Sequence, residues 1–192
     1  MPAGIIVYNT SGTVQIDDTY RNMALRAKSS SGTPTASGLY AYQRNETSGS
    51  VSWWQYDWPD TPTSTFGFQV FDASGNCTFD AMQKYARVVD VFAGPINLAG
   101  AVTKTYPSGR SYAVITAKRG LHVDQRTRPN GAQVDYQRRF VRPISYVAGA
   151  NVSVKWTLPE WPTAWIGPVS TAPAPTADDL SSQFIVLDVT DH

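Results

Sequence analysis

Short segments in which apolar and polar residues alternate, separated by turn residues, most constrain how this chain can fold. The segment Val152-Ser153-Val154-Lys155-Trp156 has this period of two, which is typical of a strand with one buried face. Thirteen prolines and 14 glycines interrupt the chain, and no long segment has the helical period. These patterns predict an all-β fold, an antiparallel β-sandwich or barrel built from hairpins. Only Ala81–Val89 and Thr176–Gln183 could hold short helices.

The length of 192 residues is sufficient for one hydrophobic core, so we expect a single domain over residues 1–192. Residues 1–66 and 67–192 would be its two sub-units. Strong strand patterns lie at 111–117 and 184–189, and an Asn-Gly turn signal at Pro129–Ala132 predicts a hairpin.

A hairpin pattern near the N-terminus, starting at Gly4, occurs a second time from Gly67 onward. Gly4 to Asp17 contains an apolar strand, an Asn-Thr-Ser-Gly turn and an alternating strand, and Gly67 to Asp80 follows the same plan. Residues 4–25 and 67–88 share five identical positions. We therefore predict a duplicated N-terminal hairpin motif, with two unrelated hairpins of similar turn chemistry as the alternative.

The second copy, Gly67-Phe68-Gln69-Val70-Phe71-Asp72-Ala73-Ser74-Gly75-Asn76, followed by Phe79-Asp80 and Arg87-Val88-Val89, resembles a segment of small tail proteins of tailed bacteriophages. The resemblance implies a non-enzymatic minor tail, tail-tip or fibre-associated protein. It implies a location in the virion, after assembly in the host cytoplasm. Expected partners are further copies of the chain, other tail proteins and a host surface receptor. Arg87 aligns with Ala24 of the first copy, so the strand after the hairpin is less alike.

The net charge of +1 conceals an uneven distribution. Residues 104–142 hold nine Lys and Arg against two Asp, a local charge of +7, and the rest of the chain carries −6. Five of these cations lie on or next to the predicted hairpin: Arg126, Arg128, Arg138, Arg139 and Arg142. On a shared face they would bind anionic groups, and the acidic remainder of another copy is the first candidate. A solvated surface ranks second, and nucleic acid is the least favoured partner.

An aromatic cluster follows at residues 53–58. In a strand, Trp54, Tyr56 and Trp58 would share one face. Such a face suits a buried core first, a protein interface second and a carbohydrate-binding platform third. A carbohydrate- or receptor-binding module of a virion is therefore the alternative function.

Catalytic signals are weak. The chain has two histidines, His122 and His192, and one cysteine, Cys77, with no zinc-like spacing or nucleophile motif. We expect no metal, no cofactor and no enzyme activity. A glycan-cleaving pair drawn from Asp57, Asp60 and Glu160 is the weaker alternative. No apolar run of membrane-spanning length and no signal peptide is expected.

Overall fold

The computed structural model describes residues 4–9, 12–17, 23–58, 65, 67–157, 164–172 and 179–192, and for 4–9 and 12–17 it describes the backbone alone. These residues form strands, turns and loops, with no helix among them, so the all-β prediction is confirmed. The strands are β1 (Gly4–Asn9), β2 (Gly12–Asp17), β3 (Ala24–Ser29), β4 (Leu39–Arg44), β5 (Val51–Asp57), β6 (Gln69–Phe71), β7 (Cys77–Asp80), β8 (Arg87–Ala93), β9 (Ala101–Thr105), β10 (Tyr112–Lys118), β11 (His122–Asn130), β12 (Gln133–Ala148), β13 (Asn151–Thr157), β14 (Ile166–Val169) and β15 (Gln183–Asp188).

The largest sheet contains six antiparallel strands in the order β3-β5-β4-β10-β15-β8. Its two ends approach each other, because Ala24 in β3 forms an isolated bridge to Tyr85, just before β8. The Leu25 amide donates to the Lys84 carbonyl at 2.7 Å, and the Ala86 amide donates to the Met23 carbonyl at 2.9 Å. The sheet therefore curls around its inner face.

That inner face holds one hydrophobic cluster: Ala41, Trp54, Tyr56, Ala113, Ile115, Leu187 and Val189. Its members come from β4, β5, β10, β15 and the residue after β15. Small alanines alternate with large aromatic rings, as expected where a curled sheet must fill a narrow interior.

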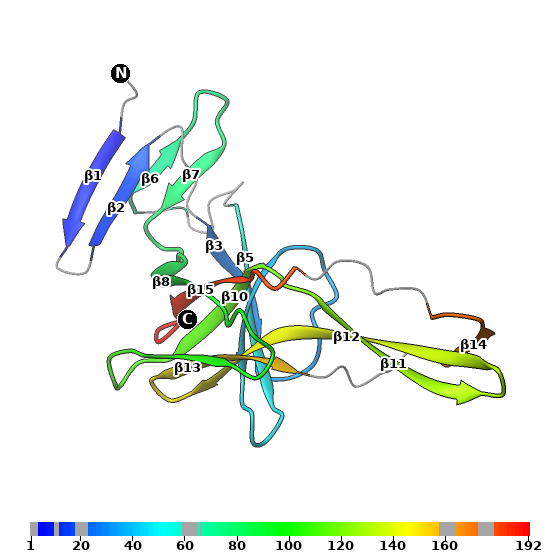
Figure 1. Cartoon of the computed structure of the whole chain (residues 1–192). Coiled ribbons are helices and arrows are strands. Elements are labelled where there is room, and N and C mark those ends of the chain that lie inside the picture. Colours follow the sequence, from blue (N-terminus) through cyan, green and yellow to red (C-terminus); the bar gives the residue numbers. More distant parts are fainter. Residues whose placement is uncertain are drawn as a thin grey trace.

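The second sheet has the order β11-β12-β13-β9. The short strand β14 pairs with the first part of β12, on the side opposite β11. β12 is 16 residues long and changes partner along its length. Gln133–Val141 pairs with β11, and Arg142–Ala148 pairs with β13. The first part belongs to a hairpin that projects beyond the region where the two sheets pack together (Figure 1), whereas the second part contacts β4 and β10 of the larger sheet.

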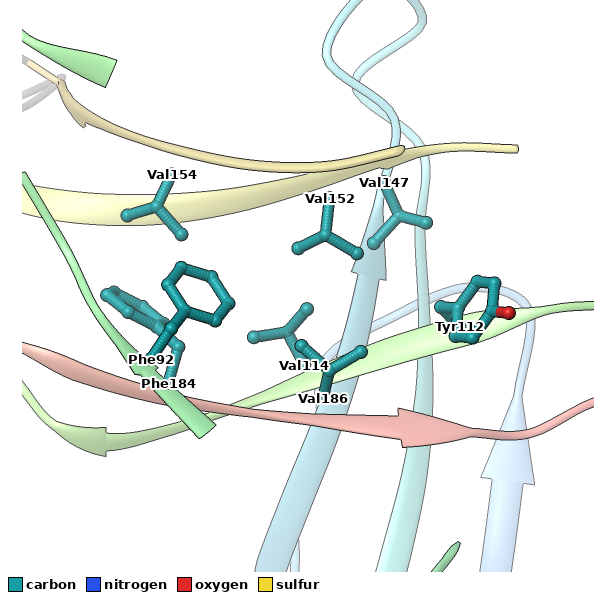
Figure 2. Packing of buried hydrophobic residues seen from close by; sticks show 8 residues of the cluster. All are labelled: Phe92, Tyr112, Val114, Val147, Val152, Val154, Phe184 and Val186. Carbon is teal, nitrogen blue, oxygen red and sulfur yellow. The ribbon is translucent and has the colours of Figure 1, made fainter. Parts of the chain in front are cut away.

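A second hydrophobic cluster fills the space between the two sheets (Figure 2). It contains Phe92, Tyr112, Val114, Val147, Val152, Val154, Phe184 and Val186. The rings of Phe92 and Phe184 stack with their centroids 5.8 Å apart. This packing of two antiparallel sheets is the sandwich that the alternating sequence predicts.

A buried carboxylate at the end of β15 links the sheet to the C-terminal residues. The Asp188 side chain accepts from Arg110 Nη1 at 2.6 Å and from the Thr190 hydroxyl at 2.6 Å, and Arg87 lies at 3.3 Å. Burial by itself raises the pKa of Asp188, but the hydrogen bonds from Thr190 and Arg110 outweigh it and hold the pKa below its ordinary value. Asp188 therefore stays ionised and keeps both arginines in place.

The two predicted N-terminal hairpins both form, as β1–β2 and β6–β7, and β2 contacts β7. Their registers differ. Val7 pairs with Val14, whereas Val70, the residue that aligns with Val7 in the second copy, pairs with Phe79. The Asp72 carboxylate explains the longer second turn, because it accepts from the backbone amides of residues 74 and 76, each at 2.9 Å. A common origin of the two hairpins stays a prediction.

The segment Ala81–Val89, which could hold a short helix, forms none. Residues 81–83 form a turn, and β8 starts at Arg87, because Val88, Val89 and Val91 favour a strand over a helix. In the second such segment, Thr176–Gln183, residues 176–178 lie outside the described part, and residues 179–183 are not helical.

The core between the sheets makes a stability prediction. Phe184→Ala deletes a fully buried ring and should lower the free energy of unfolding by about 3–5 kcal/mol, because the cavity cannot refill. Phe140→Ala is the matched control, since that ring on β12 is 40% exposed, and it should cost less than about 1 kcal/mol. Urea unfolding measures both, and equal losses would show that Phe184 does not belong to the core.

Candidate functional site

The predicted basic hairpin is present as β11 and β12, which pair from His122–Val141 to Asn130–Gln133. Residues directly opposite in an antiparallel pair lie on the same side. Arg126, Arg128 and Arg139 therefore share one face of the hairpin. Arg138 lies on the other face, where its Nε donates to Gln125 at 3.2 Å. The expected common face thus holds three of the five arginines.

Two aspartates within the hairpin already bind these three arginines. Arg139 pairs with Asp124, and Arg126 approaches the same carboxylate at 3.8 Å. The Nε of Arg128 lies 3.0 Å from Asp135. The net charge of this face is therefore close to +1 rather than +3, which weakens it as an anion-binding surface. As a contact between subunits, the hairpin stays a prediction.

The end of the hairpin is held rigidly. Asp135 accepts from the Asn130 amide at 2.9 Å as well as from Arg128, and these hydrogen bonds hold the pKa of its carboxyl below the usual range. The guanidinium of Arg128 also lies over the Trp165 ring, 4.4 Å from its centroid. These contacts, together with β14, give the hairpin a defined surface instead of a set of freely moving cations.

The predicted aromatic face is not exposed as a unit. Trp54 and Tyr56 are buried in the curled sheet, because β5 lies between β3 and β4 with its inner face covered. Trp58 follows the end of β5 and is 45% exposed. The core alternative is therefore confirmed for Trp54 and Tyr56, and an interface or sugar platform formed by all three rings is wrong.

The buried hydroxyl of Tyr56 has a polar partner in His192. The Tyr56 hydroxyl and His192 Nδ1 lie 2.6 Å apart, and burial raises the pKa of the Tyr56 phenol. The His192 carbonyl accepts from Lys28 at 2.7 Å. Tyr56 thus fixes the position of the C-terminal residue.

An exposed apolar edge lies at β8, the last strand of the six-stranded sheet. β3 bridges to Tyr85 just before β8, and beyond this bridge none of the described strands pairs with the outer side of Arg87–Ala93. Val88 and Val91 are 60% and 59% exposed, and Val89 is also exposed. We call Val88, Val89 and Val91 the β8 edge. Exposed, unpaired apolar strands are uncommon in monomeric proteins because they add strands from other chains.

A cleft of about 450 Å³ opens where β4, β10 and β12 meet. Its cationic lining residues are Arg44 of β4, Arg119 after β10, and Arg142 of β12. Tyr40 and Tyr42 form an aromatic wall. We call it the arginine cleft. It contains one residue singled out in the sequence, Arg142, which lies away from the rest of the predicted basic hairpin.

Most of this cleft was not predicted from the sequence, because no strand was assigned to the β4 segment. The alternation of Tyr40, Tyr42 and Arg44 in Leu39–Arg44 was the available signal. The convergence with Arg119 and Arg142 depends on long-range pairing, which alternation alone does not specify.

The remaining reactive groups do not form a site together. Cys77 is buried, its thiol donates to the Phe79 carbonyl at 3.3 Å, and burial raises its pKa, which disfavours the reactive thiolate. Asp57 is exposed at the end of β5, and the other two predicted acids, Asp60 and Glu160, lie outside the described residues. Within the described ranges, no three or more His, Cys, Asp or Glu side chains are placed to hold a metal ion.

The described part of the chain has no helix of sufficient length and apolar character to cross a membrane. Comparisons of the chain with protein-family models, with curated protein sequences and with solved structures find no match.

The ion pairs of the hairpin can be tested by matched substitutions. Arg139→Gln removes a charge-assisted hydrogen bond from a side chain that is only 15% exposed, and it should lower the free energy of unfolding by about 1–2 kcal/mol. Arg126→Gln should change it by less than about 0.5 kcal/mol, because Arg126 is 60% exposed and its contact is long. Urea unfolding at low salt measures the difference, and equal effects would contradict the internal pairing of Arg139.

Proposed function

We propose that this protein is a non-enzymatic structural protein of a tailed-bacteriophage virion, at the tail or tail tip, and that it works by oligomeric assembly. The observation that carries the assembly part is the β8 edge. The backbone N–H and C=O groups of β8 that do not bond to β15 point to the outer side of the sheet, and three exposed valines lie on the same strand. Pairing with a strand of another subunit would satisfy these groups and bury the valines together.

The surroundings of β8 favour a protein partner. The chain passes from β8 to β9, the edge of the second sheet, through Ile96, which is 76% exposed, and Leu98, which is also exposed. The Tyr106 hydroxyl donates to Asp90 at 2.9 Å and so links the end of β9 to β8. Both sheet edges and the exposed apolar loop residues therefore lie in one region, so a second protein chain that pairs with β8 could also cover these side chains.

A second copy of the chain is the partner proposed for the β8 edge, because two β8 strands can pair antiparallel around a twofold axis. Charge adds little to this attraction, since much of the basic segment at residues 104–142 is already paired within the chain, as in Arg110–Asp188 and Arg139–Asp124. Other tail proteins would attach to the assembled form. The resemblance of Gly67–Val89 to phage tail proteins supports the virion setting, with assembly in the host cytoplasm.

The assembly part is tested by the mass of the protein in solution. The wild-type chain should elute above the mass of a single chain in size-exclusion chromatography with light scattering. Val88→Lys with Val91→Lys should return it to the mass of a single chain, because two ammonium groups cannot be buried in the new strand pair. Ile166→Lys is the control, since this exposed residue lies on β14, and it should leave the oligomer intact.

Two outcomes would overturn the proposal. A wild-type protein with the mass of a single chain at its highest soluble concentration would exclude self-assembly through the β8 edge. Purified virions of the corresponding phage that contain no peptide of this chain would exclude the virion setting.

A further inference from the structure

The fold places three guanidinium groups around one cleft. β4 pairs with β10 at Tyr42 and Val114, and β4 also contacts β12. Arg44 ends β4, Arg119 follows β10, and Arg142 begins the part of β12 that pairs with β13. Three segments that are far apart in the sequence therefore deliver one cation each to the arginine cleft.

These three charges lack the carboxylate partners that several other arginines have. Arg87, Arg110, Arg128 and Arg139 each pair with an aspartate. By contrast, no carboxylate lines the cleft in the described part of the chain, and no ion pair joins Arg44, Arg119 or Arg142 to a described residue. Three cations around one hollow favour an anion, and guanidinium groups can bind a carboxylate through two parallel hydrogen bonds.

The wall of the cleft is rigid and partly apolar. The guanidinium of Arg44 lies 4.7 Å from the centre of the Tyr42 ring. The Tyr40 ring packs edge-on against Trp53, and its hydroxyl donates to the Ala36 carbonyl at 2.8 Å. Leu39, Ile115 and Pro143 also line the cleft. Aromatic and aliphatic surfaces of this kind accept the C–H face of a ring while the cations bind its charged substituent.

The polar side chains that line the cleft indicate which class of ring-shaped ligand it can bind. Guanidinium groups donate hydrogen bonds and accept none, and the other polar groups are the hydroxyls of tyrosine, Thr116 and Ser145. No Asn, Gln, Asp or Glu is among the described lining residues, so no side-chain amide or carboxylate is available there to bind the edge of a nucleobase. A ligand rich in acceptor oxygens suits this set better than a base or a neutral sugar.

We infer that the arginine cleft binds an acidic sugar, a pyranose ring that carries a carboxylate. The carboxylate would lie between the guanidinium groups, and the ring would lie against the tyrosine wall. The cleft of about 450 Å³ is in the range of small-molecule sites and holds a short oligosaccharide. This inference is independent of the proposed assembly, because no residue of the β8 edge lines the cleft.

Isothermal titration calorimetry of the full chain with trigalacturonate tests the inference. Binding should be detectable, and Arg142→Gln should weaken it at least tenfold, because one charge-assisted contact is lost. Arg119→Gln should act in the same direction. Arg126→Gln is the control of equal charge change, since this exposed residue lies on the hairpin outside the cleft, and it should alter the affinity less than twofold.

Two further ligands test whether the cleft prefers an acidic sugar to a neutral sugar and to a nucleotide. The methyl ester of trigalacturonate keeps the rings and removes the charges, and it should not bind. Adenosine monophosphate offers an anion on a nucleoside, and it should bind at least tenfold more weakly than trigalacturonate. Absence of trigalacturonate binding, equal weakening by Arg126→Gln, or tighter binding of the nucleotide would each overturn the inference.

Thermal unfolding of each variant confirms that it is folded, and Arg119→Gln serves as the test variant should Arg142→Gln unfold.

Discussion

The pairing of β10 with β15 supports both hydrophobic clusters of this protein. Residues 112–116 pair in register with residues 188–184, and each strand is buried on both faces. Val114 and Val186 point into the core between the sheets, whereas Ala113 and Leu187 point into the curled sheet. A shift of one residue in this pair would exchange the two sets of side chains and place each in a core of the wrong size. The sandwich and the curled sheet therefore depend on one register.

The position of this pair also explains where the exposed features lie. β15 has β10 on one side and β8 on the other, so β8 is left with an outer side that no described strand pairs with. On the opposite side of β10, β4 turns toward β12 and leaves the arginine cleft between them. The apolar edge and the cationic cleft thus follow from the same arrangement of strands, although they lie on different parts of the molecule and suit different partners.

Much of the fold could be predicted from the sequence because strand formation is a local property. The apolar run near 184–189, the alternation at 152–156 and the Asn-Gly turn of the basic hairpin each matched a strand or hairpin. β9 and β14 were not predicted, because Ala101–Thr105 is short and has no regular alternation of apolar and polar residues, and Ile166–Val169 contains Gly167 and Pro168, which disfavour strands. Near Ala81, where a short helix was possible, none forms, because Val88, Val89 and Val91 favour a strand and β8 pairs with β15.

The candidate sites were less predictable, since a site depends on which strands meet. Spacing correctly placed Trp54 and Tyr56 on one face, but it could not show that this face is buried. Charge counting found the arginines of the hairpin, but the register that pairs Arg139 with Asp124 was needed to show that they are already compensated. Arg142 was chosen as part of the hairpin and instead lines a cleft with Arg44 and Arg119, two residues that no local pattern connects to it.

Amide hydrogen exchange at two protein concentrations tests the central claim most directly, because it shows which backbone groups become protected on assembly. The account predicts that the peptide covering Arg87–Ala93 gains protection when the protein is concentrated, while the hairpin of β11 and β12 changes little. Protection gained in that hairpin with none at Arg87–Ala93, or no concentration dependence at all, would contradict assembly through the β8 edge.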